Sequence, residues 1–130
     1  MKHNQVMIIE DDEDNSLFLK DCMAEIYDGF DFVNFGSAKP ALEYLRNSEE
    51  KPLMIITDID LPGMNGLQLM DAVSKDPLLN KSDIHFFFLT TPANIQTNRP
   101  GYFQKPDHIT DLDLVAGSII RQCKSCRWIV

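Results

Sequence analysis

The amino-acid sequence predicts an α/β fold, a doubly wound parallel sheet of five strands with helices on both faces. Apolar runs alternate with amphipathic stretches along the chain, which is the order expected of β-α-β units. The run at residues 54–56 is apolar without alternation, as in a strand that is covered on both faces. A length of 130 residues is the usual size of one domain, so we expect a single domain over residues 1–130.

Each predicted strand is a short apolar run that stops at polar or turn residues. The first run is rich in branched side chains and stops at an acidic stretch, and the second stops at Gly36. The third stops at Asp58, and the turn residues Pro62 and Gly63 follow it. The five predicted strands cover residues 5–9, 30–35, 54–58, 84–89 and 102–104.

Four amphipathic segments are the predicted helices, because their apolar residues recur three and four positions apart. Asp12 or Asp14 is the N-cap expected for the first helix. Pro40 suits the first turn of the second helix, where an amide donor has no helical partner. Thr110 and Asp113 predict a capping box for the last helix. The expected apolar stripes are Leu17, Phe18, Cys22, Met23 and Ile26; Ala41, Leu42, Tyr44 and Leu45; Leu67, Met70, Ala72 and Val73; and Leu112, Val115, Ala116, Ile119 and Cys123.

The composition is that of an ordinary globular domain with a marked negative charge. Charged residues make up 25% and apolar residues 44%, and the net charge is −8. Binding to a nucleic-acid backbone needs a basic face, so the charge argues against nucleic acid and favours metal ions or other proteins as partners. The chain has no apolar run of about 20 residues and no secretory signal pattern, so we expect no membrane association and a cytoplasmic location.

The three cysteines do not indicate a disulfide framework, because their number is odd and a cytoplasmic location is reducing. Cys123 and Cys126 have C-x-x-C spacing, but no second pair and no nearby histidine supports a zinc site. We interpret them as packing residues at the end of the last helix.

Polar side chains follow four of the predicted strands. Glu10 and Asp11 follow the first strand, Asp58 the third, Thr90 the fourth and Lys105 the fifth. The carboxyl ends of parallel strands lie at one edge of a sheet, and in the order 2-1-3-4-5 the first and third strands are neighbours there. Two carboxylates about 4 Å apart repel by roughly 4 kcal/mol at an effective dielectric of about 20, so the three acids are expected to attract a divalent cation. Oxygen ligands favour Mg²⁺ over a soft metal.

The same side chains predict phosphoryl chemistry. When a metal ion neutralises its neighbours, Asp58 is able to act as a nucleophile toward phosphorus, as in aspartyl-phosphate enzymes. Lys105 offers a positive charge and Thr90 a hydroxyl, and both groups suit the oxygens of a phosphoryl group. The sequence therefore indicates a site that accepts phosphate.

These residues resemble the receiver domain of two-component response regulators, a flavodoxin-like fold of the chemotaxis type, over nearly the whole chain. The resemblance implies that Glu10 and Asp11 are the acidic metal-binding pair and that Asp58 is the phosphoacceptor. It also implies that the backbone carbonyl of Asp60 completes a Mg²⁺ site with these carboxylates.

The resemblance continues beyond the fourth strand. Thr90 resembles the switch hydroxyl, and Tyr102 resembles the aromatic switch residue three positions before the invariant lysine. Lys105 and Pro106 resemble that lysine and its cis-proline partner. The chain is then expected to be a single-domain response regulator that accepts phosphate from a histidine kinase or a phosphotransfer protein and signals to an unknown downstream protein. Its only expected catalysis is self-phosphorylation and self-dephosphorylation.

The interval between Thr90 and Lys105 departs from the family pattern. The family places a full fourth helix there, whereas this interval is short, and its stretch between Thr91 and Tyr102 has prolines at both ends. We therefore expect the fourth helix to be shortened or absent, which alters the output surface that the family builds from it.

Two other functions stay open. The shortened fourth helix suggests a receiver-shaped interaction module that works without phosphorylation. Asp58 and Asp60 resemble the nucleophile and acid pair of a haloacid-dehalogenase-type phosphatase. That family, however, places this pair early and its acidic metal motif late, which is the reverse of the order here, and 130 residues leave little room for a cap domain.

Overall fold

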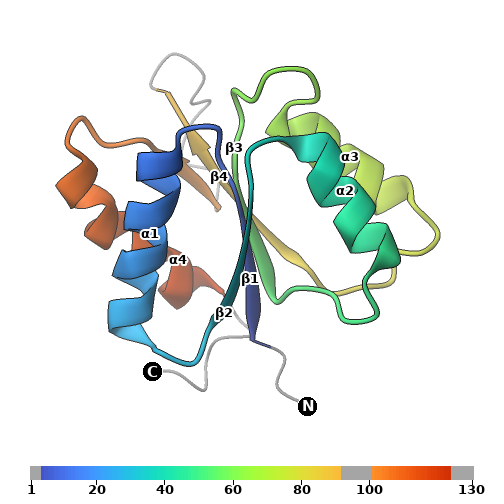
Figure 1. The fold of residues 1–130 in the computed structure, drawn as a ribbon, viewed down its shortest axis with the longest axis horizontal. Coiled ribbons are helices and arrows are strands. Elements are labelled where there is room, and N and C mark those ends of the chain that lie inside the picture. Colours follow the sequence, from blue (N-terminus) through green and yellow to red (C-terminus); the bar gives the residue numbers. More distant parts are fainter. Residues whose placement is uncertain (1–3, 92–100, 124–130) are drawn as a thin grey trace.

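A five-stranded parallel sheet forms the centre of the molecule in the computed structural model, which describes residues 4–91 and 101–123 (Figure 1). The strand order is β2-β1-β3-β4-β5, which confirms the predicted sheet and makes the first and third strands neighbours. The strands are β1 (Gln5–Ile9), β2 (Asp31–Phe35), β3 (Met54–Asp58), β4 (His85–Thr90) and β5 (Tyr102–Gln104).

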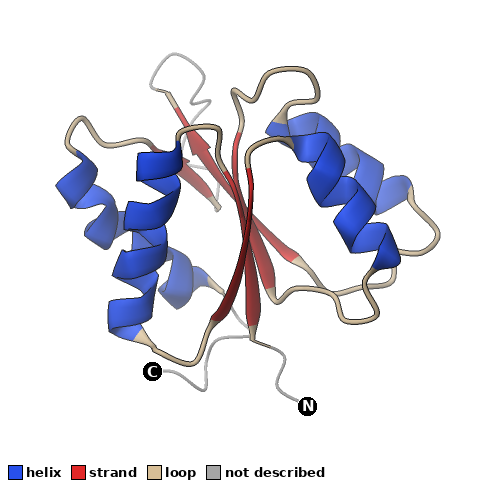
Figure 2. Ribbon diagram, viewed as in Figure 1, coloured by secondary structure: helices blue, strands red, loops and turns tan. Residues whose placement is uncertain are grey.

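Helices cover both faces of the sheet, as a doubly wound fold requires (Figures 1 and 2). Helices α1 and α4 lie on one face, and α2 and α3 lie on the other. Their bounds are α1 (Glu13–Ile26), α2 (Ala38–Asn47), α3 (Gly66–Lys75), the 3-10 turn η2 (Ile109–Asp111) and α4 (Leu112–Gln122). None of the helices in the described ranges is long and apolar enough to cross a membrane. The predicted loss of a helix between β4 and β5 concerns residues 92–100, which lie outside the described residues.

The sheet is buried from both sides, which explains why its central strands lack polar alternation. All five residues of β3 are buried. On the α1–α4 side, Met23 and Ile119 belong to the same apolar cluster as Ile56, and on the α2–α3 side Leu45 belongs to the same cluster as Ile55. Full burial of a side chain of this size stabilises the fold by about 1.5–3 kcal/mol.

The buried stripe of α1 differs from the predicted one. Leu17 and Ile26 are 49% and 44% exposed, so their assignment to the core is wrong. The stripe begins at a polar residue, Ser16, which a search for apolar periodicity overlooks, and its buried members are Ser16, Leu19, Cys22 and Met23. Asp12 is the N-cap, as predicted, and its carboxylate accepts a hydrogen bond from the Asn15 N–H at 3.1 Å.

The starts of α3 and α4 are capped differently. A capping box opens α3: the Asn65 side chain accepts from the Gln68 N–H at 2.8 Å, and the Gln68 side chain accepts from the Asn65 N–H at 2.9 Å. The predicted capping box of Thr110 and Asp113 is wrong. The N-cap of α4 lies one residue later, at the end of η2, and makes no side-chain cap hydrogen bond.

The cysteines of the described residues lie in the core. Cys22 on α1 and Cys123 at the C-cap of α4 are both buried among apolar side chains on the same side of the sheet. Burial agrees with the interpretation of Cys123 as a packing residue, whereas Cys126 lies outside the described residues.

Candidate functional site

The carboxyl edge of the sheet brings the predicted site residues together. The hydrogen-bond ladder runs one residue past two strands: the Glu10 N–H donates to the Phe35 carbonyl at 3.0 Å, and the Lys105 N–H donates to the Thr90 carbonyl at 2.8 Å. Asp58 is the last residue of β3 and is in register with β4. The backbone of the sheet therefore fixes where each of these side chains begins.

Lys105 joins two of the predicted acids. Its Nζ lies 2.9 Å from Glu10 Oε1 and 2.8 Å from Asp58 Oδ2. The side chains of both acids are 4% exposed, and that of Lys105 is 24% exposed. Buried carboxylates need a counter-charge, because an isolated ion is strongly disfavoured away from water. Lys105 supplies that charge and offsets part of the repulsion predicted between the acids.

The second carboxylate oxygen of Asp58 is held by the loop after β3. Asp58 Oδ1 accepts a hydrogen bond from the Asp60 N–H at 2.9 Å, a local pattern that aspartate side chains adopt readily. The side chain of Asp60 instead contacts the residue after β4, since its Oδ2 accepts a longer bond from the Thr91 hydroxyl at 3.4 Å. Both oxygens of Asp58 therefore have partners that define the orientation of its carboxylate.

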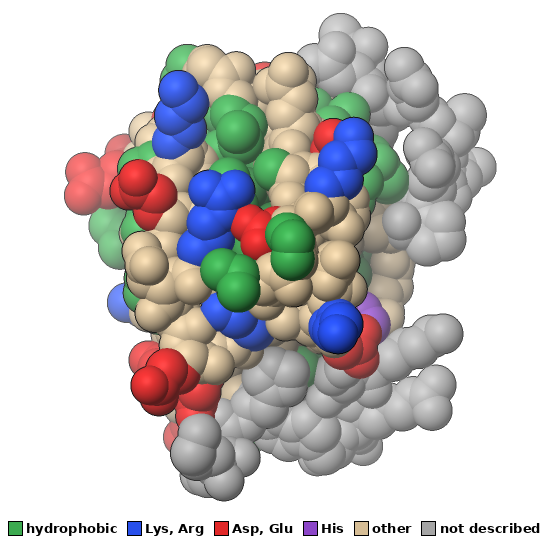
Figure 3. Space-filling model, turned by 90° about the vertical axis from the view of Figure 1, so that its right-hand side faces the viewer, with side chains coloured by type: hydrophobic (Ala, Val, Ile, Leu, Met, Phe, Trp, Pro, Cys, Tyr) green, Lys and Arg blue, Asp and Glu red, His purple; other side chains and the backbone are tan. Residues whose placement is uncertain are grey.

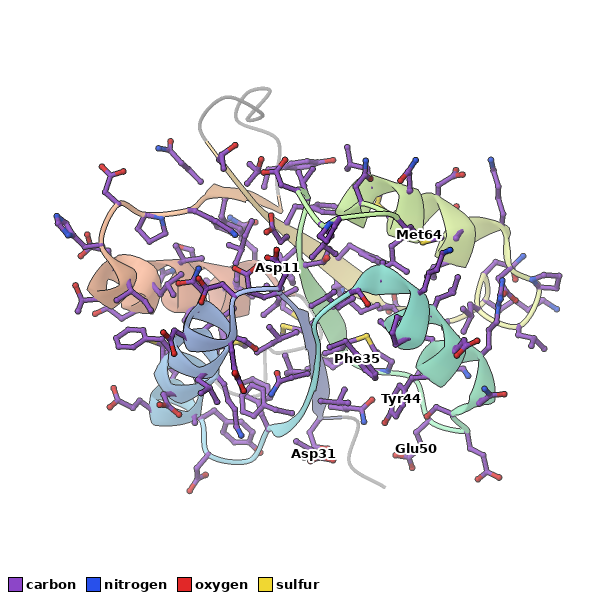
Figure 4. The ribbon with its side chains drawn as sticks, turned by 45° about the horizontal axis from the view of Figure 1, so that its top comes forward. Asp11, Asp31, Phe35, Tyr44, Glu50 and Met64 are labelled. Carbon is purple, nitrogen blue, oxygen red and sulfur yellow. The ribbon has the colours of Figure 1, made fainter. Side chains whose placement is uncertain are left out.

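Glu10, Asp11 and Asp58 form an acidic cluster that could hold a metal ion. One ligand oxygen from each residue lies within 4.8 Å of the other two. Asp11 is exposed and lies where β1 gives way to α1 (Figure 4). Glu10 Oε2 is buried and has no hydrogen-bond partner within the described part of the chain. Three carboxylates and an unsatisfied buried oxygen suit a hard cation such as Mg²⁺, and the contribution of the Asp60 carbonyl stays a prediction.

Glu10 and Lys105 have pKa values that differ from their ordinary ones. Burial raises the pKa of Glu10 from 4.5 to about 7, because it outweighs the opposing hydrogen bond and charge of Lys105. Burial alone lowers the pKa of Lys105, but its hydrogen bonds to Asp58 and Glu10 outweigh burial and raise that pKa above 10.5. At neutral pH the lysine is therefore charged, while Glu10 is protonated in part of the molecules.

Without divalent cations, the protein is expected to lose stability as the pH rises from about 4.5 to about 7. Over this window folded Glu10 keeps a proton that the unfolded chain releases, so raising the pH favours unfolding. The loss is on the order of 3 kcal/mol and should be absent in Glu10→Gln. Urea unfolding at several pH values measures it, and the same pH slope in both proteins would contradict the expectation.

Asp11→Asn is expected to raise the metal-free free energy of unfolding by about 0.5–1 kcal/mol, because it removes an exposed charge that repels Glu10 and Asp58. The same variant should lose most of the stabilisation that Mg²⁺ gives the wild type. Thermal unfolding with and without Mg²⁺ tests both effects. Asp14→Asn, at an exposed acid of the same helix start, is the matched control and should keep the Mg²⁺ response. A less stable metal-free Asp11→Asn would show that the acids do not repel.

Thr90 ends β4, and Tyr102 begins the neighbouring strand β5. Thr90 is fully buried at the end of β4, and its hydroxyl donates to the Thr91 carbonyl at 3.4 Å. Tyr102 begins β5, and its ring stacks on Phe88 with centroids 4.8 Å apart. Thr90 thus lies at the same edge of the sheet as the acids. The ring of Tyr102 instead contacts Phe88, a residue inside β4. Their roles as switch residues stay predictions.

The peptide bond between Lys105 and Pro106 is trans, because the described chain has no cis peptide bond. The cis-proline implied by the resemblance is therefore wrong. Trans is the isomer that a bond before proline favours by about 0.5–1 kcal/mol.

Two residues beside the site were not among those predicted. Asn15 Nδ2 donates to Glu10 Oε1 at 3.4 Å, and Ser16 is buried in the first turns of α1. Gly66, a turn residue in the sequence that follows Asp58, begins α3 against the backbone of Asp58. Ser16 stands three positions before Leu19, and that helical spacing could have marked it as buried. The need for glycine at position 66 depends on how closely α3 approaches β3, which periodicity does not reveal.

Residues 6–107 match the protein family described as Response regulator receiver domain. ARR21 of Arabidopsis thaliana, assigned to the two-component response regulators, is 30% identical to the chain over 114 residues. This match covers 82% of the chain and 17% of the relative, so the chain spans about a sixth of that protein's length.

Solved structures show the same fold. The phosphorylated cyanobacterial phytochrome response regulator RcpA has a TM-score of 0.77 at 20% identity, covering 95% of this chain and 96% of that one. The Mn²⁺-bound form of response regulator Rcp1 has a TM-score of 0.66 at 16% identity, covering 97% and 94%. The signal receiver domain of a histidine kinase from Syntrophus aciditrophicus has a TM-score of 0.68 at 19% identity, covering 95% and 92%.

Proposed function

The chain belongs to the response regulator receiver domain family, which it matches over residues 6–107 of 130, and on that premise we propose that Asp58 accepts a phosphoryl group in a Mg²⁺-dependent reaction. Receiver domains are signalling domains that interact with histidine kinases and phosphotransfer proteins. The donor for this chain is then a phosphohistidine of such a protein, and the signal is a change in affinity for a downstream protein.

The observation that carries this proposal is the link from Lys105 to both Glu10 and Asp58 at the carboxyl edge of the sheet. A carboxylate with fixed orientation thus lies next to the positive charge of Lys105 and two further acids. A structural ion pair needs one acid and one base, whereas here two acids share one lysine and a third acid, Asp11, lies within 4.8 Å of them. Such a surplus of negative charge suits a metal ion together with a phosphoryl group.

In the proposed step, a carboxylate oxygen of Asp58 forms a bond to phosphorus while the bond between phosphorus and the donor's imidazole nitrogen breaks. The electron pair of the broken bond leaves with the imidazole. Lys105 donates hydrogen bonds to the phosphoryl oxygens, and the Thr90 hydroxyl turns toward them from the end of β4. Glu10, Asp11, Asp58 and the Asp60 carbonyl would hold Mg²⁺, which would neutralise charge on the transferred group.

Incubation with acetyl phosphate and Mg²⁺ is expected to add one phosphoryl group per chain, because the small donor needs no partner protein. Intact-mass measurement gives the number of groups, and peptide mapping gives the residue. Asp58→Asn should show no modification, since an amide is not a competent nucleophile. Asp60→Asn is the control, because its backbone amide still reaches Asp58, and it should be modified like the wild type.

Two outcomes would overturn the proposal. One is a phosphoryl group that persists in Asp58→Asn or maps to another residue. The other is a folded wild type that binds Mg²⁺ but takes up no phosphoryl group, which would favour an interaction module that works without phosphorylation. Steady hydrolysis of a phosphomonoester that is lost in Asp60→Asn would instead support the phosphatase alternative.

A further inference from the structure

A side chain of α4 holds the start of β5. The Gly101 N–H donates a hydrogen bond to Gln122 Oε1 at 3.0 Å. Gly101 is buried and has a φ of 87°, and a Cβ added to it would lie 3.2 Å from the Phe86 carbonyl oxygen. A backbone amide in so confined a place has little access to water and needs a protein acceptor. Gln122 supplies that acceptor from 21 positions further along the chain.

The end of α4 is a firm support for this contact. Ile119, Ile120 and Cys123, which flank Gln122 in the sequence, are buried in the core on the α1–α4 side of the sheet. Gln122 itself is exposed, so its substitution removes little packing. An effect of such a substitution on the candidate site would therefore come from the hydrogen bond.

β5 relies on few backbone contacts for its position. It is three residues long, lies at one edge of the described sheet and pairs with β4. Its ladder begins where the Phe88 N–H donates to the Gly101 carbonyl at 2.7 Å. It ends where the Lys105 N–H donates to the Thr90 carbonyl at 2.8 Å. The ends of short edge strands open readily, so an anchor at Gly101 limits the movement of the whole strand.

Lys105 lies at the opposite end of this strand. An extended chain rises about 3.3 Å per residue, so Lys105 is roughly 13 Å from Gly101 along the strand. Its Nζ contacts Glu10 at 2.9 Å and Asp58 at 2.8 Å at the same time. Arrangements of this kind need their parts held to within about 0.5 Å. The geometry of the candidate site is thus sensitive to a small shift of β5.

We propose that Gln122 is a positioning residue: it holds the start of β5 through the Gly101 amide and thereby fixes Lys105 at the other end of the strand. This role rests on the proposed function, in which Lys105 donates to the phosphoryl oxygens. It follows that a shift of the end of α4 alters the candidate site through β5.

Gln122→Leu removes the acceptor, whereas Gln122→Glu keeps an acceptor oxygen at the same place. Leucine, glutamate and glutamine have similar helix propensities, so neither change should disturb α4 itself. Arg121→Leu is the neighbouring control, because the side chain of this exposed residue bonds to Ser118 within α4. Lys75→Leu is the distant control. It alters the last residue of α3, on the α2–α3 side of the molecule, where exposed basic and acidic side chains are intermixed (Figure 3).

A double-mutant cycle with Lys105→Met is the main test, by urea unfolding at about pH 8 without metal or phosphodonor. Lys105→Met is expected to raise the unfolding constant at least about fivefold less in Gln122→Leu than in the wild type, because the lysine is already displaced from its acids. In Gln122→Glu and in both controls it should have its full effect, since distant sites without shared partners are additive. A Gln122 that only stabilised the fold would also give an additive cycle.

Amide hydrogen exchange tests the same point without a double variant. In Gln122→Leu the Lys105 amide, just after β5, should exchange at least about threefold faster than in the wild type. The Glu10 amide, which donates to the Phe35 carbonyl at the same edge of the sheet, should keep its rate. A general loss of stability would instead speed the exchange of both amides.

Phosphorylation by acetyl phosphate with Mg²⁺ is expected to be about tenfold slower in Gln122→Leu than in the wild type, and close to the wild-type rate in Gln122→Glu. If the wild type takes up no phosphoryl group, the proposed function fails, whereas the cycle and the exchange rates still decide the role of Gln122. If the wild type and Gln122→Leu react at equal rates, the proposed function stands and the role of Gln122 is refuted.

Three further results would overturn this role. They are an additive cycle between Gln122→Leu and Lys105→Met, a Lys105 amide whose exchange is no faster than in the wild type or speeds up only as much as that of Glu10, and a Gln122→Glu variant that behaves like Gln122→Leu.

Discussion

Lys105→Met is expected to lower the free energy of unfolding by about 3 kcal/mol at about pH 8 without divalent cations. The substitution leaves Glu10 and Asp58, whose side chains are 4% exposed, without their shared counter-charge. Removing one partner of a buried ion pair costs about 3–5 kcal/mol. The 24% exposure of the lysine side chain places the loss at the lower end of that range. Urea unfolding measures the loss.

The size of this loss should depend on conditions. At about pH 5 Glu10 is protonated in the folded protein, so the variant loses less stability there. Lys75→Met is the matched control: its pair with Asp71 spans 3.0 Å, but the side chains are 75% and 60% exposed. Removing that pair should cost less than about 0.5 kcal/mol. Equal losses in the two variants would show that the buried acids do not rely on Lys105.

Gly66→Ala is expected to destabilise the protein by about 1–3 kcal/mol and to slow phosphorylation by acetyl phosphate about tenfold. A Cβ at this position would lie 2.7 Å from the Asp58 carbonyl oxygen and 3.2 Å from the Ile59 Cα. These are backbone atoms of β3 and the loop after it, so the strand end or the start of α3 must move. Either movement displaces the carboxylate of Asp58. Urea unfolding and the rate of phosphoryl incorporation measure the two effects.

Gly36→Ala is the matched control for this variant. A Cβ at that position meets no atom within 4 Å, and the substitution should leave both stability and phosphorylation close to those of the wild type. If Gly66→Ala behaved in the same way, the close approach of α3 to β3 would have no bearing on the site.

The positions of Glu10, Asp58 and Lys105 could be predicted from the sequence because each follows an apolar run. A parallel sheet places all such strand ends at one edge, so topology turns three separate sequence positions into one site. The burial of β3 was predictable for a similar reason, since an uninterrupted apolar strand needs cover on both faces.

The pairing within the site could not be predicted in the same way. Periodicity gives the face on which a residue lies but not which charge meets which, so the contact of Lys105 with Glu10 as well as Asp58 needed the structure. Ser16 was missed because the prediction of buried positions used apolar residues only, and serine is polar. Exposed Leu17 was placed in the core because apolar character alone does not distinguish two adjacent helix faces.

The bond of Lys105 to Glu10 spans 95 residues of sequence, and its bond to Asp58 spans 47. Contacts of such long range form late, because the chain must close large loops before they stabilise anything. Until β5 joins the sheet, Glu10 and Asp58 have no lysine between them. A chain that has been synthesised only through β4 therefore has the repulsion between the acids without the counter-charge that offsets it. The edge of the sheet that carries the candidate site is thus completed by β5, the last of the described strands in the chain.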